Sequence, residues 1–292
     1  MEQRHLLLFG YCSLSELHQH VRMHCTEAEA GRLPEIVSAW RTAQKVQPER
    51  HTTQVPSGEA TLGPRVDVEV ATSLKSEVSR SFPHLPTTLD WVSIDELVSP
   101  QRVIWLDALS KLPVPAGTSY SETELIDICL RPVHQASVQH LENANHHHTF
   151  SSANTDLRYL GTHVVSVDSK QSVFSTTGDA RYAVVSLVGF GSPMMSAWKV
   201  RERIVLHNGF HRAYALRKAG VQKIPMVVQH AQHPRELPSQ IFGLSRDYLL
   251  QTTSPPRIVD FFDSRLIYEL AGKPRQKIIT IQPTVNQLDV PM

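Results

Sequence analysis

The sequence predicts an α+β protein. Two observations carry this prediction: residues 203–229 read as strand, turn, helix and strand in succession, and helical patterns occur towards both ends of the chain. With 41% hydrophobic and 20% charged residues over 292 residues, the chain has the composition of a globular protein with a buried core. By size it forms one large domain or two smaller ones.

Residues 1–46 are predicted to form a helical N-terminal segment. Apolar residues such as Leu17 and Val21 recur at near-helical spacing, and Thr26 is followed by Glu29 at capping-box spacing. Such a segment is either a helical layer packed on the main domain, which we favour, or a small interaction module.

Residues 47–87 are predicted to be a linker followed by a short strand. The stretch up to residue 65 is rich in Pro, Gly, Ser and Thr, and Val66-Asp67-Val68-Glu69-Val70 alternates strictly between apolar and polar residues. A helix is then expected over 119–142, where Ser121 and Glu124 have capping-box spacing.

The later part of the chain is expected to hold strands and then helices. Residues 182–191 read as a buried strand ended by glycine, and residues 277–281 as another strand. Residues 233–292 are predicted to be a C-terminal helical extension and tail, with helices over 238–250 and 257–270.

Charge, cysteine content and hydropathy limit the functional classes. The formal net charge is +1, so a nucleic-acid binder would depend on a local basic cluster, for which the candidates are Arg201, Arg203, Arg212, Arg217 and Lys218. The 3 cysteines give no closed disulfide framework, and no stretch approaches the roughly 20 apolar residues of a membrane span. We therefore expect a cytoplasmic protein with no membrane partner.

The run His146-His147-His148 is the most visible histidine cluster. Neighbouring side chains on a helix point about 100° apart, and no cysteine or carboxylate is grouped with these residues. An exposed polar loop is favoured, and the sequence predicts no metal site.

The turn at residues 207–212 carries most of the functional information. A β-rich run ends at His207, Gly209 allows close backbone approach, and a run of good helix formers follows, ending before Gly220. Asn208 is expected to be the N-cap of this helix. A helix N-terminus preceded by glycine presents free N–H groups to an anion, and His211 and Arg212 would add donors.

The same residues carry a resemblance to a known family. The run Gly209-Phe210-His211-Arg212, the helix that follows it and Ile224-Pro225 resemble the signature of the ParB/sulfiredoxin superfamily over about 27 residues. Residues 91–97 resemble, more weakly, the entry segment of that family. The resemblance implies a ParB/sulfiredoxin-like mixed sheet with packed helices over 88–232, interrupted by an insertion within 107–180, with additional helical segments at both ends of the chain.

The resemblance also implies a ligand. Members bind a nucleoside triphosphate, CTP or ATP, with Mg²⁺, through this turn and helix start. Carried over residue by residue, the expected nucleotide-binding residues are Asn208, Gly209, Phe210, His211 and Arg212, and the candidates for catalysis are His207, His211 and Arg212. Phe210 departs from the family, because sulfiredoxins have their catalytic cysteine at that position, so sulfiredoxin activity is not expected.

Two classes of function remain open from the sequence. The first is a ParB-like enzyme that hydrolyses or transfers phosphate, or cuts DNA, with Asp95, Glu96 and Glu202 as candidate acidic residues. The second is a non-enzymatic scaffold or switch that depends on a nucleotide or DNA and binds a protein partner or a second copy of the chain.

Overall fold

The computed structural model describes residues 3–53, 62–114, 119–131, 137–143, 147–154, 156–167 and 180–282, without the side chains of 47–53. Several β-sheets and helices alternate along the chain, which confirms the α+β class. The chain divides into two compact units. The first comprises Met1–Val133 and Pro193–Pro274, and the second comprises His134–Ser192 and Arg275–Met292.

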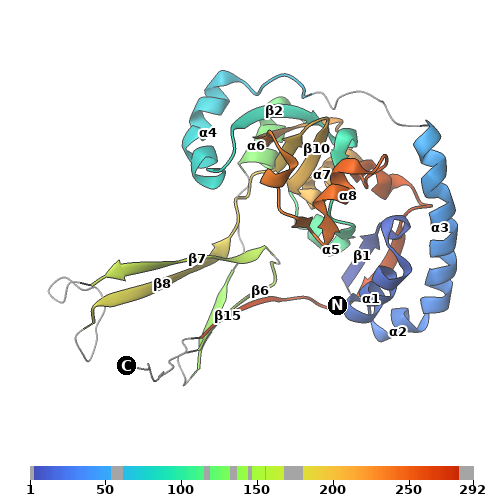
Figure 1. The fold of residues 1–292 in the computed structure, drawn as a ribbon, viewed down its shortest axis with the longest axis horizontal. Coiled ribbons are helices and arrows are strands. Elements are labelled where there is room, and N and C mark those ends of the chain that lie inside the picture. Colours follow the sequence, from blue (N-terminus) through green and yellow to red (C-terminus); the bar gives the residue numbers. More distant parts are fainter. Residues whose placement is uncertain are drawn as a thin grey trace, which may run out of the picture. The chain divides into compact units, whose positions relative to one another are not determined.

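A five-stranded mixed sheet forms the centre of the first unit (Figure 1). Its strands, in spatial order, are β2 (Thr87–Ser93), β11 (Lys223–Ala231), β9 (Ser196–Val200), β10 (Arg203–Asn208) and β3 (Leu97–Val98). The pairs β2–β11 and β9–β10 are antiparallel, whereas β11–β9 and β10–β3 are parallel. This arrangement puts the end of β10 and the start of the following helix beside β9 and β11.

Both faces of this sheet are covered. On one face the helices α4 (Val68–Ser81), α6 (Glu122–Leu130) and α7 (Phe210–Lys218) contribute to the largest apolar cluster. On the other face lie η3 (Pro234–Glu236), β12 (Gln240–Ile241), β13 (Leu244–Ser245) and α8 (Arg246–Gln251). Strands buried on both faces are apolar almost throughout, which explains the β-rich runs in the sequence.

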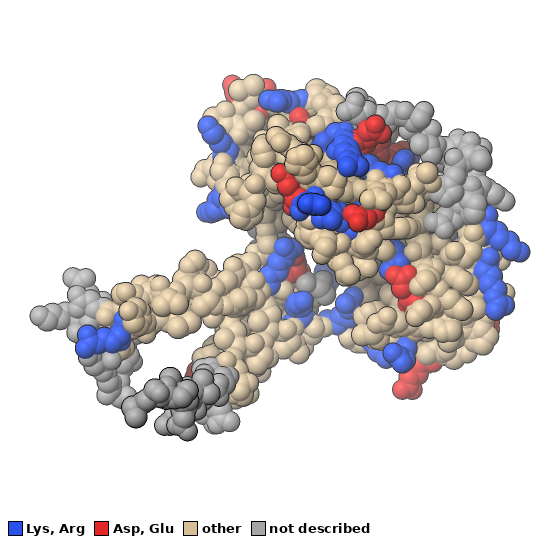
Figure 2. All heavy atoms as spheres, in the orientation of Figure 1, with Lys and Arg blue, Asp and Glu red and all other residues tan. Residues whose placement is uncertain are grey.

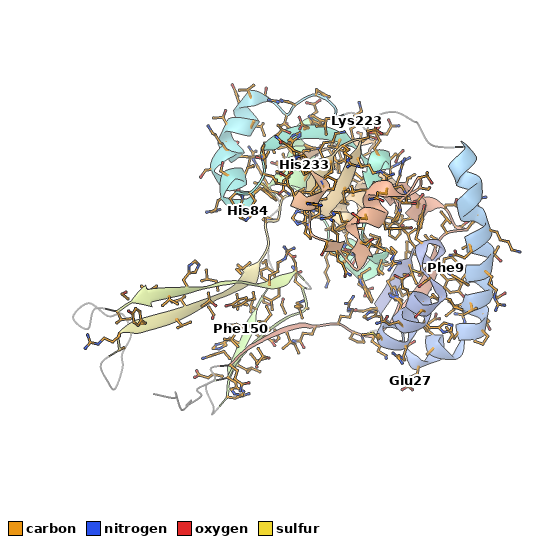
Figure 3. The ribbon with its side chains drawn as sticks, viewed as in Figure 1. Phe9, Glu27, His84, Phe150, Lys223 and His233 are labelled. Carbon is orange, nitrogen blue, oxygen red and sulfur yellow. The ribbon has the colours of Figure 1, made fainter. Side chains whose placement is uncertain are left out.

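A second, antiparallel sheet lies in the same unit in the order β14 (Tyr268–Gly272), β1 (Gln3–Leu7) and β4 (Val103–Trp105). The helices α1 (Leu14–His24), α2 (Glu27–Gly31) and α3 (Leu33–Thr53) accompany it. Leu7, Phe9, Leu17 and Ile36 are buried together there, and Figure 3 labels Phe9. Short elements complete the unit: η1 (Phe9–Tyr11), η2 (Ile94–Glu96), α5 (Leu106–Leu109) and η4 (Ile258–Phe262).

The second unit is made of strands. One sheet has the order β15 (Lys277–Ile281), β6 (His148–Ser152) and β5 (Gln139–Glu142), and a long hairpin pairs β7 (Leu157–Ser166) with β8 (Tyr182–Phe190) (Figure 1). The strand predicted at 182–191 is therefore confirmed, but its predicted burial is wrong, because Val184 is 69% exposed. A two-stranded ribbon buries little of either face.

Two predictions near the N-terminus are wrong. Gln3–Leu7 is a strand and not helix, because it pairs with both β14 and β4. The alternating run at 66–70 leads into helix α4, where Asp67 caps the first turn by accepting from the Glu69 N–H. Helix α3 extends to Thr53, and residues 54–61 of the predicted linker lie outside the described residues.

Two helix predictions further along are also wrong in extent or type. The helix predicted over 119–142 begins after Ser121, as expected, but ends at Leu130, and Gln139–Glu142 is strand β5. Residues 257–270 form a short 3₁₀ helix followed by β14, which completes the sheet beside β1. The helix expected over 238–250 is confirmed only for α8, since β12 and β13 precede it.

In the described ranges, no helix is both long enough and apolar enough to cross a bilayer.

Candidate functional site

The strand–turn–helix–strand prediction for 203–229 is confirmed. Strand β10 ends at Asn208, helix α7 starts at Phe210, and β11 starts at Lys223. The N-cap prediction is wrong by one residue: Gly209, with φ of 102°, occupies that position. Asn208 remains in the strand, and its Nδ2 donates to the carbonyl oxygen of Met194 over 3.0 Å.

Gly209 is required by packing as well as by the turn. Its φ lies in the left-handed region that side chains disfavour, and a Cβ there would stand 2.7 Å from Cγ of Met195. Because glycine has no side-chain oxygen, the N-cap residue does not satisfy the first-turn N–H groups of α7, in contrast to Ser13, Ser121 and Ser245 at other helices.

His211 faces the protein and not a ligand. Its Nε2 accepts a hydrogen bond from the backbone N–H of Trp105 over 3.0 Å. Burial lowers the pKa of His211 to about 4, so the ring is neutral near pH 7. A neutral imidazole whose Nε2 is an acceptor carries its proton on Nδ1, so the donor role predicted for His211 is left to Nδ1 alone.

Arg212 also points into the protein. Its guanidinium donates to the carbonyl oxygens of Ile128 (3.0 Å), Cys129 (3.4 Å) and Pro193 (2.5 Å). Ile128 and Cys129 belong to the last turn of α6, where carbonyl groups lack partners within the helix and the helix dipole favours a cation. In this structure the guanidinium of Arg212 caps the C-terminus of α6 and connects α6 to α7. The sequence predicts instead that it binds phosphate oxygens.

Phe210 is buried and contacts an exposed aromatic residue. Its ring meets the ring of Phe242 edge to face, with centroids 5.0 Å apart. Phe242 and Gly243 form the two-residue turn between β12 and β13 and have φ of 49° and 81°. Positive φ at both positions is the pattern of a type I′ turn, where Asn or Gly is usual and phenylalanine is strained. Phe242 is nevertheless 54% exposed, directly beside the start of α7.

His207 joins a polar cluster across three strands. Its Nδ1 lies 3.2 Å from Oγ of Ser196 on β9 and 3.3 Å from Nε2 of Gln229 on β11, and its ring stacks on Trp198 with centroids 4.1 Å apart. Sequence reasoning missed Ser196, Trp198, Gln229 and Phe242, because strand pairing and not local spacing brings them to this region. The Phe242-Gly243 dipeptide was the only local signal, as a turn.

Arg203 and Arg217, two residues of the expected basic cluster, are engaged in separate contacts and do not form one basic surface. Arg203 donates to the carbonyl oxygens of Leu249 and Thr252, and Arg217 forms an ion pair with Asp95 in which the closest N and O atoms are 2.6 Å apart. Figure 2 shows Lys and Arg side chains scattered over the visible face with acidic side chains between them. Asp95, one of the candidate acidic residues, is therefore engaged with a cation away from the turn.

The histidine run is only partly described, since His146 lies outside the described residues. His148 begins β6, and its Nδ1 lies 3.1 Å from Nε2 of His140 on β5. A different set of residues in the described chain has the spacing of metal ligands, namely His5, His20 and Cys25.

Comparisons of this chain with protein-family models, with curated proteins and with solved structures found no match.

Proposed function

We propose that this chain binds a nucleoside triphosphate, CTP or ATP, at the N-terminus of α7, and that it acts as a nucleotide-dependent module of ParB-like type. The phosphates would accept hydrogen bonds from the first-turn N–H groups of α7, and the base would stack on Phe242. The first-turn N–H groups belong to Phe210, His211 and Arg212, which the sequence already indicates, and Phe242 is added to them.

The observation that carries the proposal is the exposed Phe242 beside a helix start whose N-cap residue is glycine. Gly209 supplies no side-chain cap to the first turn of α7, and a helix N-terminus preceded by glycine attracts anions. Phe242, held at a backbone conformation unfavourable for its side chain, presents its ring next to that turn. Strained residues of this kind cluster at ligand sites, and aromatic rings bind nucleobases by stacking.

Binding is better supported than turnover. Phosphoryl transfer needs charge neutralisation and a group that positions the nucleophile. His211 is neutral and Arg212 is bonded to carbonyl groups, so neither is placed to act on a phosphate, and Phe210 has no titratable group. The geometry therefore favours the non-enzymatic alternative, in which nucleotide binding is read out by a partner.

Titration calorimetry of the full chain with CTP, ATP and the matching nucleosides, with and without Mg²⁺, tests the proposal. One triphosphate should bind, and the nucleoside should bind much more weakly. Phe242→Asn should reduce affinity by about 10-fold or more, since base stacking contributes on the order of 1–3 kcal/mol. Asn suits the left-handed region, so this variant should fold at least as stably as the parent chain.

Phe262→Ala is the matched control. Phe262 is also an exposed phenylalanine, 42% accessible, but it stacks on Tyr214, one turn further along α7, with Arg217 over its ring. It should leave nucleotide affinity unchanged. If no nucleotide binds, or if both variants reduce affinity equally, the proposed site is wrong. Measuring the inorganic phosphate released in the same samples shows whether the bound triphosphate is also hydrolysed.

A further inference from the structure

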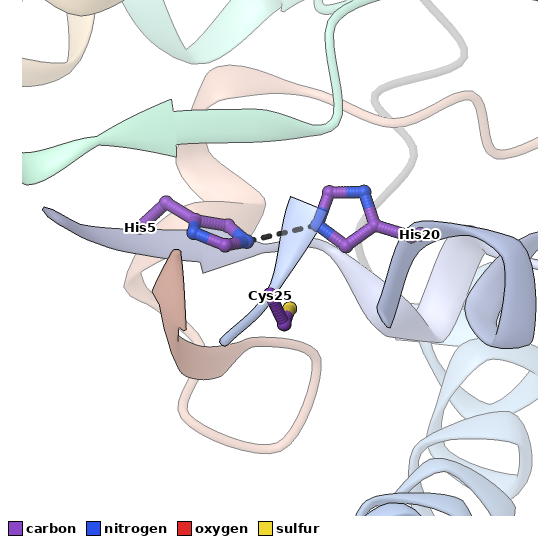
Figure 4. A group of neighbouring side chains, drawn as sticks. All are labelled: His5, His20 and Cys25. Atoms are coloured by element: carbon purple, nitrogen blue, oxygen red, sulfur yellow. Dashed lines mark hydrogen bonds between the residues drawn. The ribbon is translucent and has the colours of Figure 1, made fainter. Parts of the chain in front are cut away.

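Three potential metal ligands converge in the first unit, and Trp105 lies between this group and the α7 turn, because its ring contacts His5 and its backbone N–H donates to His211. They are His5 on β1, His20 on α1 and Cys25, which follows α1 (Figure 4). The Nε2 atoms of His5 and His20 are 2.8 Å apart, and one ligand atom from each of the three residues lies within 4.8 Å of the others. We call these residues the His5 cluster.

Local structure holds the three side chains in place. Strand β1 is the central strand of its sheet, so pairing on both edges fixes His5. Leu17 and Val21 bury one face of α1 and thereby orient His20 on the same helix. Cys25 ends α1 and forms an isolated β-bridge with Gly272 on β14. Two of the three residues are deeply buried, His5 at 0% and Cys25 at 1% exposure, whereas His20 is half-buried and gives access from solvent.

The two imidazole nitrogens are close to the spacing of a tetrahedral site, and all three ligand atoms lie within 4.8 Å of one another. With metal–nitrogen bonds of ~2.0 Å and metal–sulfur bonds of ~2.3 Å, ligand atoms in a tetrahedral zinc site stand roughly 3.3–3.6 Å apart. The Nε2 atoms need to separate by only about half an ångström to reach this spacing, and they already point at each other (Figure 4). Imidazole and thiolate together select Zn²⁺ and similar transition metals over Mg²⁺ or Ca²⁺, which prefer oxygen.

A role for Cys25 as a free nucleophile fits less well. Its thiol is buried, with 1% of the residue exposed, so a dissolved electrophile has little access to it. A bound transition metal stabilises the thiolate directly, and the displaced proton passes to solvent.

We propose that Nε2 of His5, Nε2 of His20 and Sγ of Cys25 bind one Zn²⁺ ion, with a water molecule at the fourth position. The ion joins β1, α1 and the segment that bridges to β14. The competing account of the short His5–His20 contact is a hydrogen bond between the two imidazole rings.

The experiment uses the untagged full chain, stripped with a chelator and titrated with Co²⁺ and then with competing Zn²⁺. One Co²⁺ per chain should bind with the near-ultraviolet charge-transfer band of a thiolate ligand, and Zn²⁺ should abolish that band and raise the melting temperature. Cys25→Ser should remove the band and weaken Zn²⁺ binding by ~100-fold or more, beyond the 10–100-fold typical of residues that only support ligands. His20→Ala, at a half-buried position, should weaken binding similarly and gives a second readout if Cys25→Ser folds poorly.

Two variants are matched controls. Cys12 is another buried cysteine in the same apolar cluster, and His18 is an exposed histidine on the same helix. Cys12→Ser and His18→Ala should keep the band and the affinity. The proposal is overturned if Co²⁺ binds without a thiolate band, if no stoichiometric metal binds, or if Cys25→Ser and His20→Ala bind Zn²⁺ as the parent chain does. The three residues are not among those proposed to bind the nucleotide. Failure of the metal titration therefore overturns only the metal site, and the nucleotide calorimetry decides the nucleotide site separately.

Discussion

Arg212 gives the most discriminating prediction, because the sequence and the structure assign it different roles. The motif suggests a phosphate-binding arginine, whereas the structure shows a cap on α6. Replacement by alanine removes all three hydrogen bonds to the carbonyl oxygens of Ile128, Cys129 and Pro193. It also removes a cation from the C-terminus of α6.

The expected loss of stability follows from those contacts. A hydrogen bond to a charged group contributes about 1.5–3 kcal/mol, and leaving a buried acceptor unpaired costs about 1–3 kcal/mol. The three bonds share one guanidinium and are not additive, so we expect a total loss of about 3 kcal/mol. For a domain of this size that corresponds to a fall in melting temperature of roughly 6–12 °C.

Thermal unfolding followed by far-ultraviolet circular dichroism measures this effect. Arg217→Ala is the control on the same helix, since Arg217 forms a partly exposed ion pair with Asp95 that should contribute about 0–1 kcal/mol. Arg212→Lys should recover part of the loss, because it keeps the charge but not the planar fork.

The opposite pattern would refute the assignment. If Arg212→Ala melts within about 2 °C of the parent chain, less than the shift expected for 1 kcal/mol, the α6 cap contributes little. If that variant also loses nucleotide binding, Arg212 contacts the ligand, and the orientation described here is not the one that functions.

Two further predictions concern α7 and the glycines that flank it. Gly220→Ala should cost about 1–2 kcal/mol, the usual penalty for a left-handed residue, because φ is 91° and a Cβ would meet nothing within 4 Å. Gly209→Ala should cost clearly more by urea denaturation, since a Cβ would also collide with Met195 at 2.7 Å; equal losses would contradict the packing argument. The pKa of His211 falls from 6.5 to about 4 on folding, so the stability that its neutral ring gives the fold is present above pH 6.5 and is lost as pH falls towards 4. When the pH is lowered from 6.5 to 4.5, the free energy of unfolding of the parent chain should fall by about 2 kcal/mol more than that of His211→Gln. Identical pH profiles would show that His211 is not held neutral.

Local sequence was sufficient to predict the backbone of the central motif. Gly209 and Gly220, both at positive φ, bound a run of good helix formers, and β-rich residues flank it, so each element follows from its nearest neighbours. The helix starts at Thr26 and Ser121 were predictable for the same reason, because each cap bonds the N–H three residues later.

Where two backbone choices were both acceptable locally, only tertiary pairing selected one. The run Tyr268–Gly272 reads as the end of a helix but becomes strand β14, because β1, far away in sequence, offers an edge to pair with. Strand β8 reads as buried because it is apolar, yet its sole partner in the described chain is β7, and much of it remains exposed.

The partners of the functional side chains were likewise decided by the tertiary structure. Arg212 lies 84 residues from Ile128 and His211 lies 106 residues from Trp105, and no local pattern in the motif indicates either contact. Likewise, the two imidazoles of the His5 cluster, 15 residues apart, meet only when β1 and α1 pack together. Backbone conformation depends mainly on neighbouring residues, whereas the direction in which an arginine or histidine makes its bonds depends on acceptors and donors that folding brings in from elsewhere in the chain.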